Sequence, residues 1–263
     1  MSLSYPHEPG ARMPTADHHP IVELRQYTLH PGQRDALIDL FDREFVETQE
    51  AHGMRVLGQF RDLDQPDLFV WLRGFADMDA RRRALEAFYG GPVWAAHRAA
   101  ANATMIDSDN VLLLRPAWPG AASTLPQHAR PAPGATGTAA GVLDATVFYL
   151  HEPATPALLD YCRHRMVPVL QRGGARQVAW YSTEASPNTF PRLPVRAGEH
   201  VLPVRAGEHV LLGLALFGDA AALQSFTNSG AWARDIAPGL APWLARAPET
   251  HRLQPTARSA LHA

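Results

Sequence analysis

The chain has 263 residues, of which 46% are hydrophobic and 19% charged, and its formal net charge is −2 at pH 7. This is an ordinary globular composition, and so small a charge creates no field that would gather nucleic acid or an anionic membrane. The single cysteine excludes an internal disulfide, and residues 1–20 contain no apolar run long enough for a signal sequence or a membrane span. We therefore expect a cytoplasmic protein with a flexible N-terminal segment at 1–20.

The first folded unit alternates between strand and helix patterns. Residues 21–29 alternate in hydrophobicity as a half-buried strand does, and apolar residues at helical spacing predict a helix over 33–51. Further strands are predicted at 54–61, 68–75 and 104–115, with a second helix between the last two. This β-α-β-β-α-β order is that of the ferredoxin-like unit.

The same order recurs in the second half of the chain. The phrase YTLHPG begins at Tyr27, and the similar phrase FYLHEP begins at Phe148, at an offset of 121 residues. Strands and helices again alternate, with strands predicted at 143–151, 175–183, 209–217 and 250–253, and helices at 155–172 and 220–244. The chain is therefore interpreted as a diverged tandem duplication.

These patterns predict two ferredoxin-like units, at 21–117 and 142–256, joined by a Pro/Ala/Gly-rich linker at 118–141. Each unit carries its helices on one face of its sheet and leaves the other face apolar. Because such a face cannot stay in water, we predict that the two sheets pack on each other. The expected fold is α+β, a dimeric-type α/β barrel within one chain. The nonapeptide LPVRAGEHV, repeated at once within 193–210, predicts a lengthened exposed loop.

The first unit also carries a recognisable motif. The stretch VELRQYTLHPGQ from Val22, together with LFDREFVETQEAHG, LFVWLRGF and LLLRP, resembles the NIPSNAP family of the dimeric α/β-barrel superfamily. The resemblance covers residues 21–117 well and 143–255 more weakly. It implies the fold predicted above and no defined activity, because the superfamily includes cofactor-free monooxygenases, haem-dependent enzymes and plain ligand binders.

Five side chains of the first unit fall on two strand faces: Glu23, Arg25 and Tyr27 on one strand, Trp71 and Arg73 on another. Arginine suits a carboxylate or enolate, and Trp and Tyr suit a ring, so such a row would line a pocket for a small molecule with a polar head and a flat body. We therefore predict that the last four of these residues bind a ligand. The alternative is structural, with Glu23 and Arg25 pairing to lock an interface.

An enzymatic version of this site assigns further roles. Arg25 or Arg73 would stabilise a developing oxyanion, and Glu23 or His97 would move a proton. His97, three residues after Trp94, is also a candidate haem ligand, although an inert histidine has the same pattern. Otherwise we expect no cofactor and no metal site, because dinucleotide, Walker, HExxH and CxxC motifs are absent from the sequence.

The duplication supplies an internal control for the site. At the offset of 121, Arg25 corresponds to Thr146, and at an offset of 142, which aligns the later strands, Trp71 corresponds to Gly213. The second unit has thus lost the polar and aromatic row. We expect one site at most, in the first unit, with the second unit as a scaffold or lid and Gly213 as a gap that could add volume to the cavity.

The favoured function is the binding of a small aromatic or acyl metabolite in a cavity of the first unit. The alternatives are a cofactor-free monooxygenase and a non-enzymatic interaction module that uses exposed helices or the loop at 187–208. Neither nucleic acid nor membrane is an expected partner. The expected assembly is a monomer with an internal pseudo-dimer, or a homodimer of it.

Overall fold

The computed structural model describes residues 19–123, 125–194 and 208–263. Most of the predicted N-terminal segment and of the repeated nonapeptide lies outside these residues. In the first unit the strands are β1 (Ile21–Leu29), β2 (Arg55–Asp62), β3 (Leu68–Phe75) and β4 (Met105–Pro116). Its helices are α1 (Arg34–Leu40), the π-helical segment η2 (Phe41–Phe45), α2 (Val46–Ala51), α3 (Met78–Gly90) and α4 (Pro92–Asn102).

The second unit repeats this order. Its strands are β5 (Val142–Leu150), β6 (Ala175–Thr183), β7 (His209–Phe217) and β8 (Glu249–Pro255). Its helices are α5 (Pro156–Tyr161), the π segment η3 (Cys162–Met166), α6 (Val167–Arg172), α7 (Ala220–Asn228), α8 (Ala231–Asp235), α9 (Ala237–Leu240) and the 3₁₀ turn η4 (Ala241–Trp243). The prediction of one helix over 220–244 was wrong. Gly230 takes a positive φ of 64° there, and Pro238 and Pro242 each begin a new short helix.

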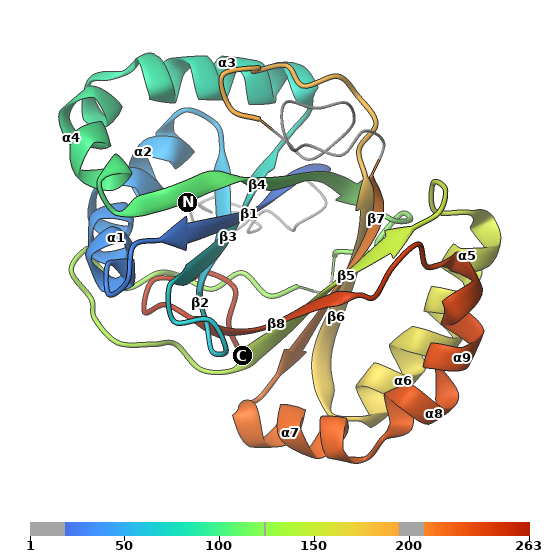
Figure 1. The fold of residues 1–263 in the computed structure, drawn as a ribbon. Helices are drawn as coiled ribbons and strands as arrows, with labels where there is room; N and C mark the ends of the chain where they lie inside the picture. The colour runs from blue at the N-terminus through green and yellow to red at the C-terminus, as the bar shows by residue number, and fades with distance from the viewer. Residues whose placement is uncertain (1–18, 124, 195–207) are drawn as a thin grey trace, which may run out of the picture.

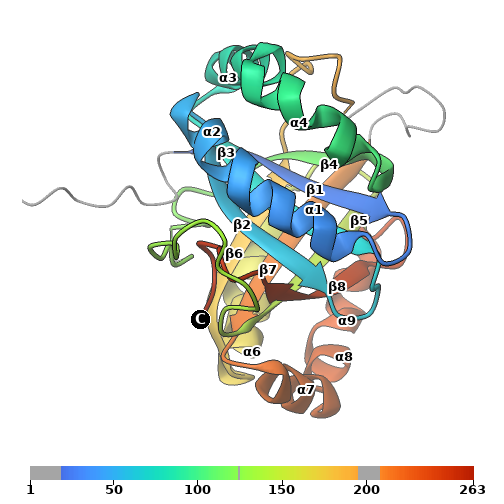
Figure 2. The ribbon, with the colours of Figure 1, turned by 90° about the vertical axis from the view of Figure 1, so that its left-hand side faces the viewer.

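The eight strands close into one barrel, in the order β1-β3-β2-β8-β5-β7-β6-β4 (Figure 1). Each unit contributes four adjacent strands in ferredoxin-like order. The units meet at two seams, where β2 pairs with β8 and β4 pairs with β6. Helices α1–α4 cover one side of the barrel and α5–α9 cover the opposite side (Figure 2). The predicted fold is confirmed.

Side-chain alternation divides the core into layers. Leu24 and Leu72 point into the barrel, where they pack with residues of the second unit such as Leu143. Their neighbours Glu23 and Arg25 point outward and are buried beneath the helices of the first unit. Burying each large apolar side chain stabilises the fold by roughly 1.5–3 kcal/mol. The polar row predicted from the sequence therefore lies between sheet and helices, outside the barrel interior.

The two units match in register as well as in order. Arg25 faces Trp71 across β1 and β3, and the corresponding positions Thr146 and Gly213 face each other across β5 and β7. The π segments η2 and η3 also begin 121 residues apart, at Phe41 and Cys162. Each interrupts a helix that the sequence predicts as continuous, because the extra residue of a π turn leaves the apolar periodicity nearly unchanged.

The connector between the units packs closely against the first unit. Leu125 is buried, and Arg130 forms an ion pair with Glu50 at 2.9 Å. The C-terminal tail runs beside it, where buried Arg258 donates to the main-chain oxygen of Asp42. Within the part of the chain that the structure describes, no helix has the length and apolar character needed to cross a membrane.

Candidate ligand-binding site

A buried ion cluster centred on Glu23 forms the floor of the candidate site. Arg25 follows it by two residues on β1, Arg73 faces it across β3, and Arg81 reaches it from α3. The Glu23 carboxylate accepts hydrogen bonds from Arg25 Nη1 at 2.8 Å, from Arg73 Nε at 2.8 Å and from Arg81 Nε at 2.7 Å. None of the four side chains is more than 1% exposed. One carboxylate thus holds together two strands and a helix.

The three guanidiniums fix the charge of Glu23. Burial by itself would raise the pKa of this carboxyl, but Arg73, Arg25 and Arg81 outweigh burial and hold its pKa well below its usual range. An ionised carboxylate with three cations is a poor proton carrier at physiological pH. The geometry therefore fits the structural alternative for Glu23.

Arg25 links the ion cluster to the aromatic residues above it. Its Nε donates to the Tyr27 hydroxyl at 2.9 Å, and its guanidinium carbon lies 5.6 Å from the centre of the Trp71 ring. Burial would lower the pKa of Arg25, but Tyr27 and Glu23 outweigh that effect and raise it. Arg25 is therefore a permanent cation held against two aromatic rings.

A cavity of about 250 Å³ lies between this floor and the helices. Of the four predicted ligand-binding residues, Arg25, Tyr27 and Trp71 line the cavity. Arg73 lies behind them, with its Nη1 donating to Gln49 Oε1 at 3.1 Å. The remaining walls are mainly aromatic and come from η2, α3 and α4, with the side chains of Phe41, Phe45, Phe88, Tyr89 and Trp94. The cavity thus places one guanidinium among mainly aromatic side chains.

The second unit supplies part of the rim. Arg192 and Leu193, from the connection between β6 and β7, line the cavity together with first-unit residues. In the same loop Phe190 stacks on Tyr89, with ring centres 5.9 Å apart, and Asn188 Oδ1 accepts from Arg81 Nη1 at 3.0 Å. The site therefore belongs to both units.

Two other sequence expectations have a different outcome. The ring of His97, on α4, faces η2: it packs edge to face on Phe45 at 6.3 Å, and its Nε2 is 3.5 Å from Glu44 Oε2, but it does not line the cavity. The prediction that a gap at Gly213 adds volume to the cavity was wrong. The Trp180 ring fills that space, since a Cβ at Gly213 would lie 2.8 Å from one of its carbons.

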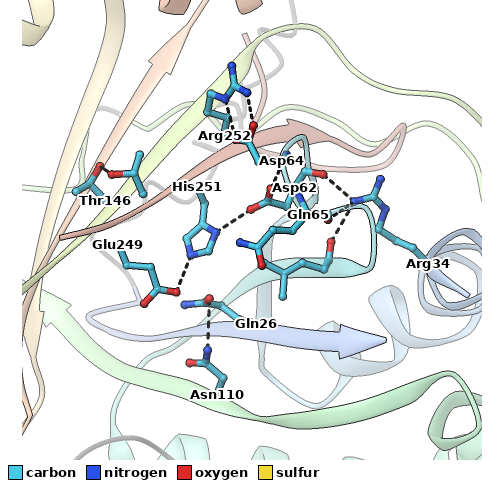
Figure 3. Close-up of polar contacts among 12 residues, drawn as sticks. Gln26, Arg34, Asp62, Asp64, Gln65, Asn110, Thr146, Glu249, His251 and Arg252 are labelled. Carbon is cyan, nitrogen blue, oxygen red and sulfur yellow. Dashed lines mark hydrogen bonds and ion pairs between the residues drawn. The ribbon is translucent and has the colours of Figure 1, made fainter. Parts of the chain in front are cut away.

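A second polar cluster, missed by the sequence analysis, lies at the seam between β2 and β8. Figure 3 shows His251 between two carboxylates, with Nδ1 2.7 Å from Asp62 Oδ2 and Nε2 3.0 Å from Glu249 Oε1. Burial would lower the pKa of His251, but hydrogen bonds to Asp62 and Glu249 raise it to about 9. Glu249 also accepts from the Tyr149 hydroxyl. The i, i+2 spacing of Glu249 and His251 on one strand was the only sequence signal for this cluster.

Metal binding has no support in the described ranges: they contain no group of three His, Cys, Asp or Glu side chains placed to hold an ion. Cys162 is buried beneath the second-unit helices, and burial raises the pKa of its thiol to about 12. It is an inert core residue.

The barrel defines the class of protein. A proposed monooxygenase from Fusobacterium nucleatum aligns with a TM-score of 0.57 and 9% identity over 92% of this chain and 94% of that one. An anthrone oxidase-like protein aligns with a TM-score of 0.51 and 16% identity over 94% of this chain and 97% of that one. At such identities these likenesses show the fold alone, that of the dimeric α/β barrels.

A family match covers the first unit. The NIPSNAP family model matches residues 22–118, so this unit is a NIPSNAP domain and the resemblance predicted from its motif is confirmed. A NIPSNAP family protein of unknown function from Agrobacterium tumefaciens is 21% identical over 38% of this chain and 89% of that one, with a TM-score of 0.35. No curated protein matches the chain.

Proposed function

We propose that this protein binds a small, flat aromatic or acyl molecule in the cavity of its NIPSNAP domain. The observation that carries the proposal is the cavity of about 250 Å³ with Arg25 on its floor and aromatic side chains on its walls. Ligand sites are typically concave, mainly apolar and supplied with a few fixed polar groups, and this cavity has each of these features. Binding as proposed requires no cofactor.

A cofactor-free monooxygenase is the second candidate. The fold neighbours described as a proposed monooxygenase and an anthrone oxidase-like protein favour it. In that reaction Arg25 would stabilise an enolate or other developing oxyanion. The proton carriers suggested by the sequence support it less, because Glu23 is held ionised by three cations and His97 lies outside the cavity lining.

A direct test combines native mass spectrometry with a ligand screen. The protein is weighed as purified, and a library of aromatic and acyl metabolites is then ranked by the rise in melting temperature. Arg25→Ala should abolish the rise for the best ligand, whereas Thr146→Ala, at the matching position of the second unit, should leave it unchanged. Equal loss in both variants would contradict the proposed location.

The same preparation tests the remaining proposals. We propose a cytoplasmic protein that binds neither nucleic acid nor membrane, as a monomer with an internal pseudo-dimer or a homodimer of it. The native mass distinguishes the two assemblies. A Soret band in the visible spectrum that His97→Ala removes would favour haem binding instead. A protein that binds no small molecule but captures a defined protein partner would favour the interaction module.

A further inference from the structure

The buried charges of the Glu23 cluster do not balance. Arg25, Arg73 and Arg81 face a single carboxylate, Glu23, and all four side chains are essentially inaccessible to water. From this imbalance we infer that the ligand of the cavity is an anion, a carboxylate or enolate on a one- or two-ring aromatic body, and that Arg25 holds its charged group. This inference rests on the proposed function and assigns the chemical class of its ligand.

The other partners of the three arginines are neutral. Arg25 donates to the Tyr27 hydroxyl, Arg73 to the side-chain oxygen of Gln49, and Arg81 to Asn188 and Thr189. Neutral acceptors satisfy hydrogen bonds but remove no charge. Buried charge without a counter-ion is strongly unfavourable, so a bound anion would stabilise this cluster.

Only one of the three guanidiniums in the cluster is open to a ligand. Arg25 lines the cavity, whereas Arg73 and Arg81 do not. Arg25 uses Nε for Tyr27 and Nη1 for Glu23, which leaves Nη2 to donate to a bound oxygen. A hydrogen bond between a guanidinium and a carboxylate is among the stronger kinds in proteins. The charged end of the ligand should therefore lie against Arg25.

The rim does not neutralise this floor. Asp109 lines the cavity but is exposed; burial and Asp107 raise its pKa, whereas the positive charge of Arg25 lowers it. A carboxylate in water is screened and contributes little to a buried charge. Arg192, also on the rim and exposed, adds another positive group along the path of entry. An entering anion therefore meets positive charge at the rim and again at the floor.

The aromatic walls and the cavity volume indicate the shape and size of the apolar part of the ligand. Phe41 and Trp71 pack edge to face with their ring centres 4.7 Å apart, and Phe88 and Trp94 are tilted at 5.9 Å. Rings arranged in this way offer both faces and edges to a planar guest. The cavity of about 250 Å³ exceeds the roughly 150 Å³ that is enough for benzene in an engineered protein core. One or two fused rings with an acidic group are therefore the expected size.

The test compares each acid with its uncharged isostere. Benzoate and 2-naphthoate are titrated calorimetrically into the wild-type protein at neutral pH, alongside benzamide and 2-naphthamide, which have nearly the same shape. We expect at least one acid to bind about tenfold to a hundredfold more tightly than its amide, as expected for a charged hydrogen bond. In Arg25→Gln this ratio should fall to near one. In the control variant Arg82→Gln, which removes an exposed arginine that pairs with Glu86 and does not line the cavity, it should stay unchanged.

The possible outcomes distinguish a failure of the anion inference from a failure of the proposed binding function. An acid and amide that bind equally well to the wild type would overturn the anion inference and leave the cavity as a binding site. If none of the four compounds binds, the inference fails, and an aromatic or acyl hit from the wider screen decides whether the proposed function fails with it. Should Arg25→Gln not fold, Arg25→Lys replaces it: this variant keeps the charge but loses the guanidinium fork, so the acid should still bind more tightly than the amide.

Discussion

The two units share one skeleton and differ in what fills it. Both have the same strand order, the same pairing register and a π segment at the same place in the first helical stretch. In the first unit the space between sheet and helices holds a cavity above the Glu23 cluster. In the second unit Trp180 and Trp232 stack against Phe148, with ring centres 6.1 Å and 6.0 Å away. The difference teaches that the backbone provides the frame, whereas a few side chains decide whether it encloses a site.

The largest expected difference between the units lies at their matching acidic positions. Glu23→Gln should lower the free energy of unfolding by about 3–5 kcal/mol, because it removes the carboxylate that pairs with three buried guanidiniums. Asp144→Asn, at the corresponding position, should leave it unchanged or raise it, because burial raises the pKa of Asp144 to about 6 and so makes its ionised form unfavourable in the folded state at neutral pH. Urea unfolding at neutral pH measures the free energy of unfolding of both variants. Equal losses of stability would contradict the expected difference between the two units.

The stability that the seam between the units contributes should fall at alkaline pH. His251 has a folded pKa of about 9, above its ordinary value near 6.5, so protonation favours the folded state. Its contribution is complete below about pH 6.5 and disappears as pH rises through about 9, a loss of roughly 3 kcal/mol. Urea unfolding at several pH values tests this, with His251→Gln as the variant that should lose the dependence. A persistent slope in that variant would assign the effect to other groups.

The next largest expected effect on stability comes from overfilling the packed space around Gly213 in the second unit. Gly213→Ala places a methyl group 2.8 Å from the Trp180 ring and should cost about 1–3 kcal/mol of stability. Adding Trp180→Phe should recover part of that loss, because the smaller ring leaves room for the methyl group. Additive losses in the double variant, measured by thermal and urea unfolding, would show that the two residues do not compete for this space.

The smallest expected effect on stability concerns the connection between β6 and β7 of the second unit, which contacts the first unit. Asn188→Ala removes one of the two loop acceptors for Arg81 Nη1 and a donor to the Leu193 carbonyl, and should cost about 1 kcal/mol. Ser186→Ala, in the same loop but bonded only to Glu184, should cost less than half of that. Ligand affinity should fall in the first variant alone. A change of ligand affinity in both variants would indicate that the loop acts through its overall conformation and not through Asn188.

Much of this fold could be predicted from the sequence. The strands β1, β3, β6 and β7 fall at the residues predicted for them, because alternating or continuous apolar runs bounded by turn residues specify a strand locally. The π segments could not be predicted in this way. Nor was the break after Gly91 anticipated, where Pro92 opens α4 as a separate helix.

The candidate site was only partly predictable, for a different reason. Strand alternation alone places Glu23, Arg25 and Tyr27 on one face, and the structure gathers them as expected. Arg81 was missed because it is one of three consecutive arginines, and only the helix orientation shows which of them turns inward. The partners Asp62 and His251 lie 189 residues apart, so no local pattern connects them.

The asymmetric loop has a consequence for how such a protein can change. In a barrel made of two identical chains every mutation appears twice, so a residue that helps one binding site also alters its symmetry mate. Here the connection between β6 and β7 reaches over the first unit's cavity, whereas β2 and β3 are joined by the short turn 63–67. Joining both units in one polypeptide lets each position vary alone. One half can therefore specialise in recognition while the other acquires the packing of an ordinary core.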